Sequence, residues 1–256
     1  MRVAVCCKGI PTGFNLDSVQ LDGDNIKPQG ADIYINEVDA YALEASIALK
    51  QAYGTEIYAI SLGSLKTQEV LYYAIAKGVD HAILAEGETS RPELLANCLA
   101  HNLKEIEPHI ILTGVQSEDW GGGEVGIYLS QALNMGLAYA VVEICELNDT
   151  SVRIKKELGG GKIAEEVVKL PAVLCVQSGI ETLQYVSAIK RKKARKSKIQ
   201  TGVKLNLSDA EQKIPGMMTY EFKEVALTPR EGQAEMFTGE RSEMAEKLLD
   251  IIRKTV

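Results

Sequence analysis

Short apolar runs alternate with amphipathic segments through the first half of the chain. The apolar runs are typical of buried strands, and segments whose apolar residues recur every three or four positions are typical of helices. The expected strands are residues 3–7, 56–62, 81–85 and 109–113. The expected helices are residues 37–52, 67–77, 91–104 and 124–134. This alternation predicts an α/β fold in which helices cover both faces of a parallel sheet.

The helix expected at residues 37–52 carries the clearest helical pattern. Asn36 stands where an N-cap residue is expected, and Asp39 in the first turn suits the helix dipole. The apolar residues of this segment share one face: Val38, Tyr41, Ala45, Leu49 and Ala52. One side of the helix should therefore pack against the sheet.

The pattern changes after residue 138, where strand-like segments follow one another without helices between them. These segments are residues 139–147, 151–157 and 163–169. Asn, Asp and Gly residues at 148–149 and 159–161 are turn signals between antiparallel strands. Pro171 precedes one more expected strand, at residues 172–177. We therefore expect the sheet to end in an antiparallel hairpin and a return strand.

The C-terminal quarter has little apolar sequence of its own. A last helix is expected at residues 242–254, with Ser242 as its N-cap. The segment 200–240 has only scattered apolar residues: Met217, Met218, Tyr220, Phe222, Val225 and Leu227. A long arm of this kind must pack on another surface, and a partner subunit is the natural candidate. We expect an α/β domain at residues 1–187 and a basic segment with an extended C-terminal arm at residues 188–256.

The charge of the chain is unevenly placed. Residues 190–198 carry seven positive charges against a total of −7, which leaves −14 on the remaining residues. Such a charge distribution argues against nucleic-acid binding, because nucleic-acid binders spread basic residues over a face. The basic run is either a solvated, mobile stretch or a loop that docks an acidic partner or cofactor phosphates.

Several features of the sequence indicate a cytosolic protein. Hydrophobic residues make up 46% of the chain and charged residues 25%, the balance of a soluble globular protein. No apolar stretch approaches the roughly 20 residues of a membrane span, and the expected first strand leaves no room for a signal peptide. The five cysteines show no CxxC spacing and lie mostly in apolar runs: Cys6, Cys7, Cys98, Cys145 and Cys175. Such cysteines are typical of small buried side chains in a reducing compartment.

Residues 109–126, HIILTGVQSEDWGGGEVG, predict a strand, a glycine-rich loop and the start of a helix. Ligands of open parallel sheets bind at the carboxyl ends of the strands, and a helix N-terminus attracts anions. The glycines at 121–123 would let the backbone approach a phosphate closely. A glycine-rich turn is a weak motif, so nucleotide binding and an ordinary connecting loop both remain open.

No catalytic group or metal site stands out in the sequence. His81, His101 and His109 lack the spacing of metal ligands or of a base beside a nucleophile. Neither a Walker A lysine nor a GxGxxG segment after the first strand is present. A nucleotide cradle without bond-breaking groups fits a carrier or a binding subunit better than a hydrolase.

Six segments, in collinear order over nearly the whole chain, carry a joint pattern: VAVCCKGIP, INEVDAYALEASIALK, LKTQEVLYYAIAKGVDHAILAE, LTGVQSEDWGGGEVG, LPAVLCV followed by KKARKSK, and REGQAEMFTGERSEMAEKLLDII. Together they resemble the β subunit of electron transfer flavoprotein. The resemblance implies the adenine nucleotide alpha-hydrolase-like fold, a Rossmann-like α/β fold. It also implies a heterodimer in which FAD, held by the α subunit, shuttles electrons between dehydrogenases and an acceptor.

The resemblance further implies that this subunit holds AMP, or a second FAD in electron-bifurcating members. Carried over by position, Cys6 and Asn36 would border the adenine or ribose. The pocket wall would be formed by Leu62, Gly63, Gly114 and Ser117. The residues facing the phosphate would be Gly123, Glu124, Val125 and Gly126.

This sequence departs from the family pattern in two places. Glu124 stands where the family has Gln, and because an anion beside a phosphate is unfavourable, phosphate binding should rest on backbone N–H groups. The family's Leu-Pro-Asn-Ile-Met stretch before its lysines is replaced by AIKRK at 188–192. The candidate partner-binding residues are Ala188, Ile189, Lys192, Lys193 and Lys196. The loss of the usual apolar anchor indicates a divergent branch with an unusual electron partner.

Two other functions fit an adenine-nucleotide cradle. One is a stand-alone nucleotide sensor resembling the universal stress proteins, against which the long C-terminal arm argues. The other is an adenosine-nucleotide hydrolase, which would need a metal or lysine constellation that the sequence does not show.

Overall fold

The computed structural model of the chain describes residues 1–13, 19–22, 25–28, 31–89, 91–204 and 236–255. It divides into two compact units, Met1–Tyr220 and Glu221–Val256, and each is described by itself. The expected α/β fold is confirmed in the first unit, and most of the expected elements are present within one to three residues of their expected ends.

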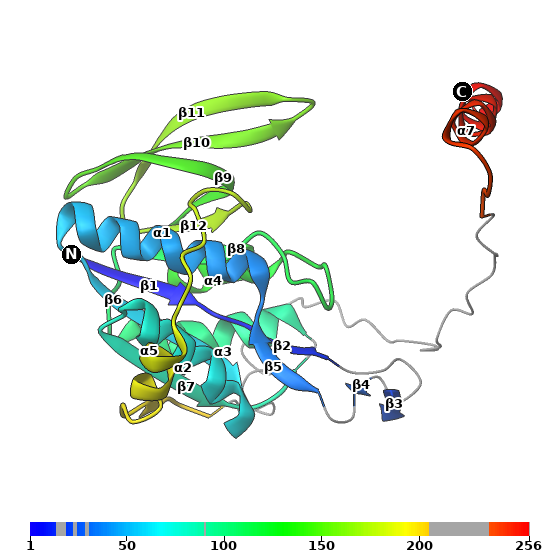
Figure 1. Ribbon diagram of the computed structural model, residues 1–256. Coiled ribbons are helices and arrows are strands. Elements are labelled where there is room, and N and C mark those ends of the chain that lie inside the picture. Colours follow the sequence, from blue (N-terminus) through cyan, green and yellow to red (C-terminus); the bar gives the residue numbers. More distant parts are fainter. Residues whose placement is uncertain (14–18, 23–24, 29–30, 90, 205–235, 256) are drawn as a thin grey trace. The chain divides into compact units, whose positions relative to one another are not determined.

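A nine-stranded sheet forms the centre of the first unit (Figure 1), in the order β11-β10-β9-β12-β8-β1-β6-β7-β13. From β9 to β13 in that order, all neighbouring strands run parallel. The central strands are β1 (Arg2–Cys6), β6 (Glu56–Gly63), β7 (His81–Glu86), β8 (Ile110–Gly114) and β12 (Ala172–Val176). Their carboxyl ends therefore lie at one edge of the sheet, where ligands of such sheets bind.

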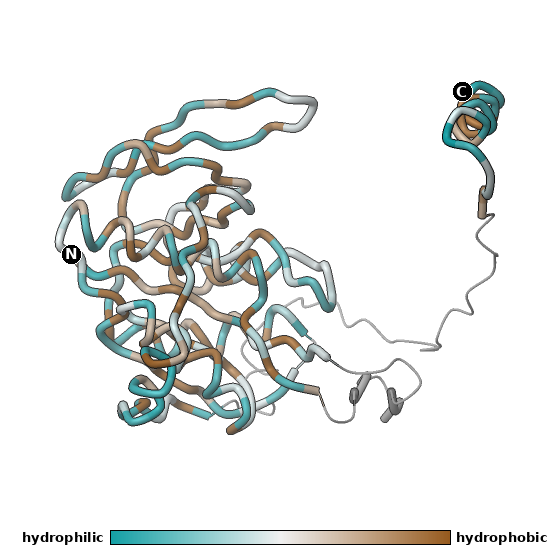
Figure 2. The backbone as a smooth tube through the Cα atoms, in the orientation of Figure 1, coloured by the Kyte–Doolittle hydropathy of each residue, from teal (hydrophilic) through white to brown (hydrophobic). Residues whose placement is uncertain are grey.

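Helices cover both faces of the sheet, as expected. On one face lie α1 (Glu37–Tyr53) and α2 (Gln68–Lys77), and on the other lie α3 (Pro92–Lys104) and α4 (Val125–Leu133). Figure 2 shows many of the apolar stretches running through the middle of the unit. This arrangement follows from the strands, whose buried residues on both faces read as continuous apolar runs.

The expected hairpin and return strand are also present. β9 (Gly136–Leu147), β10 (Ser151–Gly159) and β11 (Lys162–Lys169) pair antiparallel. The chain then returns through β12, which lies between β9 and β8 and runs parallel to both. The turn between β10 and β11 needs glycines, since Gly159, Gly160 and Gly161 all have positive φ.

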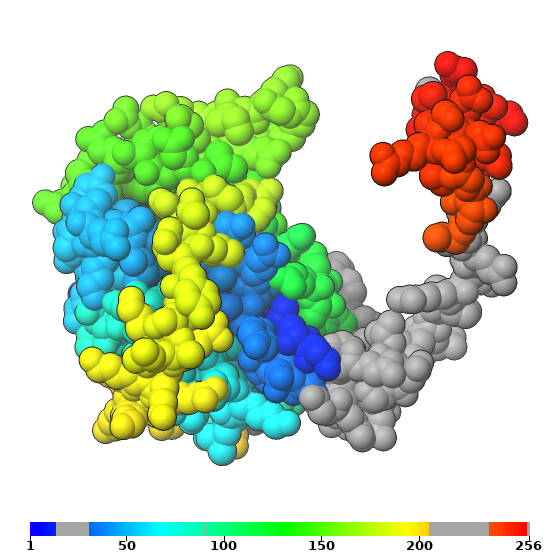
Figure 3. Space-filling view, viewed as in Figure 1, coloured from blue at the N-terminus to red at the C-terminus, as the bar shows by residue number. Residues whose placement is uncertain are grey.

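The first part of the basic run forms a helix and not the loop that we expected. Residues Ala188–Ala194 form the helix α5, which lies against α2. The Ser187 hydroxyl caps it by accepting the Lys190 N–H at 3.3 Å, and Ala194 is buried. In Figure 3 the yellow segment that leads into α5 lies across the surface of the unit. Lysine and arginine are good helix formers, so a basic run can form a helix once one small residue anchors it.

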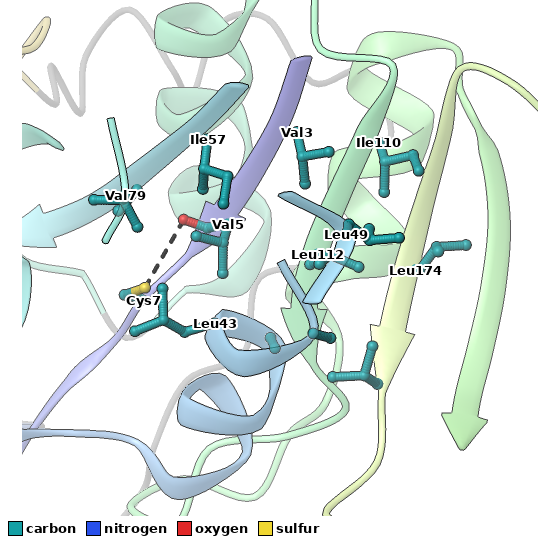
Figure 4. Packing of buried hydrophobic residues seen from close by; sticks show 14 of the residues in the cluster. Val3, Val5, Cys7, Leu43, Leu49, Ile57, Val79, Ile110, Leu112 and Leu174 are labelled. Carbon is teal, nitrogen blue, oxygen red and sulfur yellow. Dashed lines mark hydrogen bonds between the residues drawn. The ribbon is translucent and has the colours of Figure 1, made fainter. Parts of the chain in front are cut away.

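The packed side chains between α1 and the sheet form one core cluster (Figure 4). This cluster contains Val3 and Val5 of β1, Leu112 of β8, and Leu43 and Leu49 of α1. The opposite face of β1 contributes to a second cluster, which is closed by α3 and α4. Burying a side chain such as Leu43 completely stabilises the fold by about 2 kcal/mol.

Several short elements were not expected from the sequence. They are β2 (Gly9–Thr12), β3 (Val19–Asp22), β4 (Asn25–Pro28), β5 (Asp32–Ile35), β13 (Gln200–Thr201) and the 3-10 helix η2 (Leu65–Thr67). β2 pairs with β5 and β3 with β4, each antiparallel. Strands this short contain too few residues to show a clear hydrophobic period.

The described part of the second unit is one helix, α7 (Arg241–Thr255). It begins one residue before Ser242, so Ser242 lies inside the helix and is not the N-cap that we expected. Leu248, Leu249 and Ile252 are about half exposed on it. The scattered apolar residues expected to pack on a partner, Met217 to Leu227, lie outside the described residues, and the boundary at residue 187 stays a prediction. No described helix is both long and apolar enough to cross a membrane.

Candidate functional site

A cavity of about 600 Å³ opens at the carboxyl ends of β1, β6 and β8. Its volume lies within the range of small-molecule sites. Nine of the ten residues predicted to bind a cofactor line it: Cys6, Asn36, Leu62, Gly63, Gly114, Ser117, Gly123, Glu124 and Val125. The structure thus brings together residues from three βα loops, and their contact with a cofactor stays a prediction.

The tenth residue, Gly126, does not line the cavity among the described residues and lies behind its wall. A Cβ at this position would be 2.3 Å from Cys175 Sγ and 2.9 Å from Thr113 Oγ1. Glycine is therefore required here so that α4 can lie directly against β12 and β8. This packing places the N-terminus of α4 at the cavity.

Asp39 ties together two of the strand ends that form the cavity wall. Its carboxylate accepts the Lys8 N–H and the Gly114 N–H, each at 2.8 Å. Burial raises the pKa of this carboxyl to about 6, although both backbone N–H groups and the Lys8 charge act in the opposite direction. The sequence suggested only a helix-dipole role for Asp39, because its partners are distant along the chain.

Asn36 occupies the N-cap position of α1, but its side chain makes no cap hydrogen bond. Its Oδ1 accepts the Glu118 N–H at 3.1 Å, and its Nδ2 donates to the Gln116 carbonyl at 2.9 Å. The Glu118 carboxylate accepts the Glu37 N–H at 2.8 Å and so takes over part of the cap role. The glycine-rich loop is thereby fastened to the start of α1.

Gly123 is the tightest point of this loop. It has a φ of +68°, and a Cβ there would lie 2.7 Å from the Val115 carbonyl oxygen and 2.8 Å from the Tyr139 hydroxyl. Tyr139 donates to the same Val115 carbonyl at 2.9 Å, which closes the loop behind the cavity. Because α4 begins directly after this turn, its first N–H groups, at Val125 and Gly126, have no intrahelical partner. Such a helix start is suited to an anion.

The charged side chains of the cavity wall do not favour an anion. The described lining residues include two lysines, Lys8 and Lys66, and four acids, Asp39, Glu88, Asp119 and Glu124. Lys8 Nζ is already held by Asp119 at 2.6 Å and by Ser117 Oγ at 3.1 Å. Lys66 lines the cavity too, and no acid among the described residues pairs with it. The expectations that a phosphate binds the N-terminus of α4 and that Glu124 does not contact it stay predictions.

Ser61 at the end of β6 offers a polar group to a ligand. Its side chain is 1% exposed and lines the cavity, and its hydroxyl has no hydrogen-bond partner within the described residues. A buried hydroxyl without a partner is costly, so such a group in a cavity wall is suited to a ligand or a water molecule. No local pattern in the sequence marks Ser61, which lies in a mostly apolar strand.

Burial disfavours the thiolate form of the cysteines near the cavity. Burial raises the pKa of the Cys6 and Cys7 thiols well above the ordinary value, and it raises that of Cys175 to about 11. All five cysteines are free of disulfides, and four of them are buried, as the sequence indicated. Across the residues that the structure describes, no cluster of His, Cys, Asp and Glu is suited to a metal ion.

Comparison with known proteins assigns this site to a family. The model of the electron transfer flavoprotein domain matches residues 25–204, a range that contains most of the cavity wall. The chain belongs to the electron transfer flavoprotein family. The resemblance inferred from the six segments is thereby confirmed.

Three relatives from this family match the chain over nearly its whole length. An electron transfer flavoprotein subunit beta of Bacillus subtilis is 26% identical, over 93% of this chain and 92% of that protein. The subunit beta of Methylophilus methylotrophus is 27% identical, over 99% and 98%. That of Syntrophomonas wolfei is 28% identical, over 100% and 97%.

The candidate partner-binding residues are exposed on or beside α5: Ala188, Ile189, Lys192, Lys193 and Lys196. Ile189 is 83% exposed, which is unusual for a large apolar side chain. Two other cations of the basic run face the unit instead, since Arg195 pairs with Glu69 at 2.7 Å and the Arg191 guanidinium lies over the Tyr73 ring. α5 therefore has a side fixed to α2 and a basic side open to a partner.

Proposed function

We propose that this chain is the β subunit of an electron transfer flavoprotein, which pairs with an α-type subunit that holds FAD. The observation that carries this proposal is the match to β subunits over 93–100% of the chain. A stand-alone sensor would not need the C-terminal segment that this match includes. When bound, FAD takes up and releases electrons. The β chain binds its nucleotide, shields the flavin from solvent and docks the redox partner. The expected cytosolic location stays a prediction.

The cavity is proposed to hold an adenine nucleotide, either AMP or the corresponding half of a second FAD. Three features support this ligand: the start of α4 suits a phosphate, Gly123 permits close approach, and the Ser61 hydroxyl needs a partner. Asn36 shapes the wall through the loop that it holds, because both polar atoms of its side chain are already bonded. In this arrangement Cys6 borders the site as a neutral thiol.

Co-expression of the chain with its α-type subunit tests the proposed function. The expected product is a yellow complex with the flavin absorption band, from which denaturation releases FAD and the nucleotide of the β cavity. Identifying that nucleotide separates AMP from a second FAD. A stable complex without flavin would overturn the proposed function.

Trp120 is expected to report ligand binding in the cavity. It lines the cavity, is 44% exposed and is the single tryptophan of the chain. Adding AMP or FAD to nucleotide-stripped complex should quench the emission of Trp120, and FAD should quench it more because the flavin absorbs in that region. Subtracting the signal of a Trp120→Phe complex isolates this residue. Unchanged emission at ligand levels that equilibrium dialysis shows to be bound would contradict the proposed site.

The basic side of α5 is proposed to dock an acidic redox partner. Changing Lys192, Lys193 and Lys196 together to glutamate should slow flavin reduction by a reduced flavodoxin, an acidic probe, roughly 10- to 100-fold at low salt. The effect should shrink as salt rises, because screening weakens attraction between exposed charges.

The matched control changes three exposed lysines elsewhere, Lys104, Lys162 and Lys169, to glutamate. It alters the net charge equally but leaves α5 intact. Equal slowing in both triple variants would mean that net charge alone acts, and unchanged rates in the α5 variant would reject docking at α5.

A further inference from the structure

A buried ion pair holds the extended segment that leads into α5. Glu44 of α1 and Lys77 of α2 form this pair, with side chains only 6% and 4% exposed. The segment 182–187 connects the end of the sheet to α5 and crosses both helices close to this pair (Figures 1 and 3). We call this segment the strap.

The pair binds the strap at a single residue, Gln184, through its backbone N–H and carbonyl. Glu44 Oε1 accepts the Gln184 N–H at 2.7 Å. Lys77 Nζ donates to the carbonyl oxygen of the same residue. The Glu44 carboxylate thus accepts from the backbone N–H, and the Lys77 ammonium donates to the backbone carbonyl. The pair therefore fixes both the position and the direction of this part of the chain. Hydrogen bonds to charged groups are the stronger kind.

A shared aromatic ring continues this contact to α5. Lys77 Nζ lies 5.4 Å from the centre of the Tyr73 ring, and the Arg191 guanidinium of α5 lies 5.2 Å from it. At the other end of α5, Arg195 donates to Glu69 of α2. α5 is therefore held before its start, in its middle and after its end, which leaves Ile189, Lys192 and Lys193 directed to solvent.

We propose that Glu44 and Lys77 are positioning residues, which fix the strap so that the basic side of α5 faces the redox partner. This inference rests on the proposed docking role of α5. A buried ion pair is weak evidence for stability, since apolar side chains often replace one without loss. Its hydrogen bonds to both backbone groups of Gln184 give it a different purpose, which is to specify a single arrangement of a surface segment.

The test replaces both charges together, as Glu44→Leu with Lys77→Met, so that no unpaired charge stays buried. The assembled complex is examined in two ways. Hydrogen exchange follows the amides of residues 184–195, and stopped flow follows flavin reduction by reduced flavodoxin and by dithionite. We expect exchange at these amides to rise and reduction by flavodoxin to slow roughly five- to tenfold, because the docking arrangement becomes a minor population. Reduction by dithionite should not change.

Two control variants accompany the test. Lys50→Met with Asp80→Asn removes another ion pair of α1, 2.6 Å long, that does not touch the strap, and it should leave all three readouts unchanged. Glu44→Gln with Lys77→Met keeps an acceptor oxygen for the Gln184 N–H without a buried unpaired charge, and it should restore part of the exchange protection and of the flavodoxin rate relative to the Glu44→Leu, Lys77→Met variant.

The outcomes separate this inference from the docking role on which it rests. Retained protection at residues 184–195 in the double variant would overturn the inference, since the pair would not hold the strap. Lost protection with an unchanged flavodoxin rate would overturn it too, provided that the triple lysine variant of α5 is slowed. If that triple variant is also unaffected, docking at α5 itself is rejected.

Discussion

Replacing Gly123 with alanine is expected to weaken nucleotide binding in the cavity strongly. The new Cβ would lie 2.7 Å from the Val115 carbonyl oxygen and 2.8 Å from the Tyr139 hydroxyl, and both are bonded to each other. The loop must then move away from β9, and the first turn of α4 moves with it. We expect nucleotide affinity to fall roughly tenfold or more, and the free energy of unfolding to fall by about 1–3 kcal/mol.

Gly121 provides a matched control for this variant. It has nearly the same φ, +66° against +68°, but no heavy atom lies within 4 Å of its ideal Cβ. Gly121→Ala therefore carries the backbone strain of a left-handed residue without the close contacts. Isothermal titration with AMP and with FAD, on stripped complexes, compares the two variants. Equal loss of affinity in both variants would mean that backbone strain, and not close contact with Val115 and Tyr139, causes the effect of Gly123→Ala.

The central elements of the fold were predictable because their chemistry is local. β1 and β8 are buried on both faces, so each reads as an unbroken apolar run, and α1 shows its helical period over 17 residues. The same local reasoning did not detect β2 and β5, which are four residues each, and one of them contains Pro11. It also failed for α5, whose helix depends on Ser187 and on contacts with α2.

The site was predictable only where a single loop carries the signal. The glycine-rich stretch predicts a loop backbone that other groups approach closely. At Gly123 the Val115 carbonyl and the Tyr139 hydroxyl lie that close. The groups that set the shape of the cavity come from remote positions. Asp39 accepts hydrogen bonds from the backbone of Lys8, 31 positions before it, and of Gly114, 75 positions after it. No local sequence pattern marks contacts between residues so far apart. The fastening of Asn36 to the loop, 80 and 82 residues away, was missed for the same reason.

Asp39→Asn is expected to remove a pH dependence that burial of this carboxyl creates. Because the pKa in the folded chain is about 6, above the ordinary 3.8, the folded state holds the proton more tightly than the unfolded state. The stability contributed by this group is full below the ordinary pKa and is lost as the pH rises through about 6. The gap corresponds to about 3 kcal/mol of unfolding free energy. Asparagine does not titrate, so this component disappears in the variant.

Urea unfolding of both complexes between pH 4 and pH 7 measures the effect. The difference, wild type minus Asp39→Asn, should fall by about 2 kcal/mol across this range, because part of the contribution is already lost at pH 4. Asp80→Asn is a control in which the pKa shift has the opposite direction. Burial raises the pKa of Asp80, but hydrogen bonds from Lys50 and from the Ile57 N–H leave that pKa below the ordinary value.

The Asp80 contribution is present above the ordinary pKa and is lost as the pH falls through the lower folded value. Its difference curve should therefore not fall as the pH rises. A flat or rising curve for Asp39 would mean that the two N–H bonds from Lys8 and Gly114 outweigh burial. The hydrogen bonds by which Asp39 links the ends of β1 and β8 would then be strongest with the carboxylate ionised, and the cavity would be most stable near neutral pH.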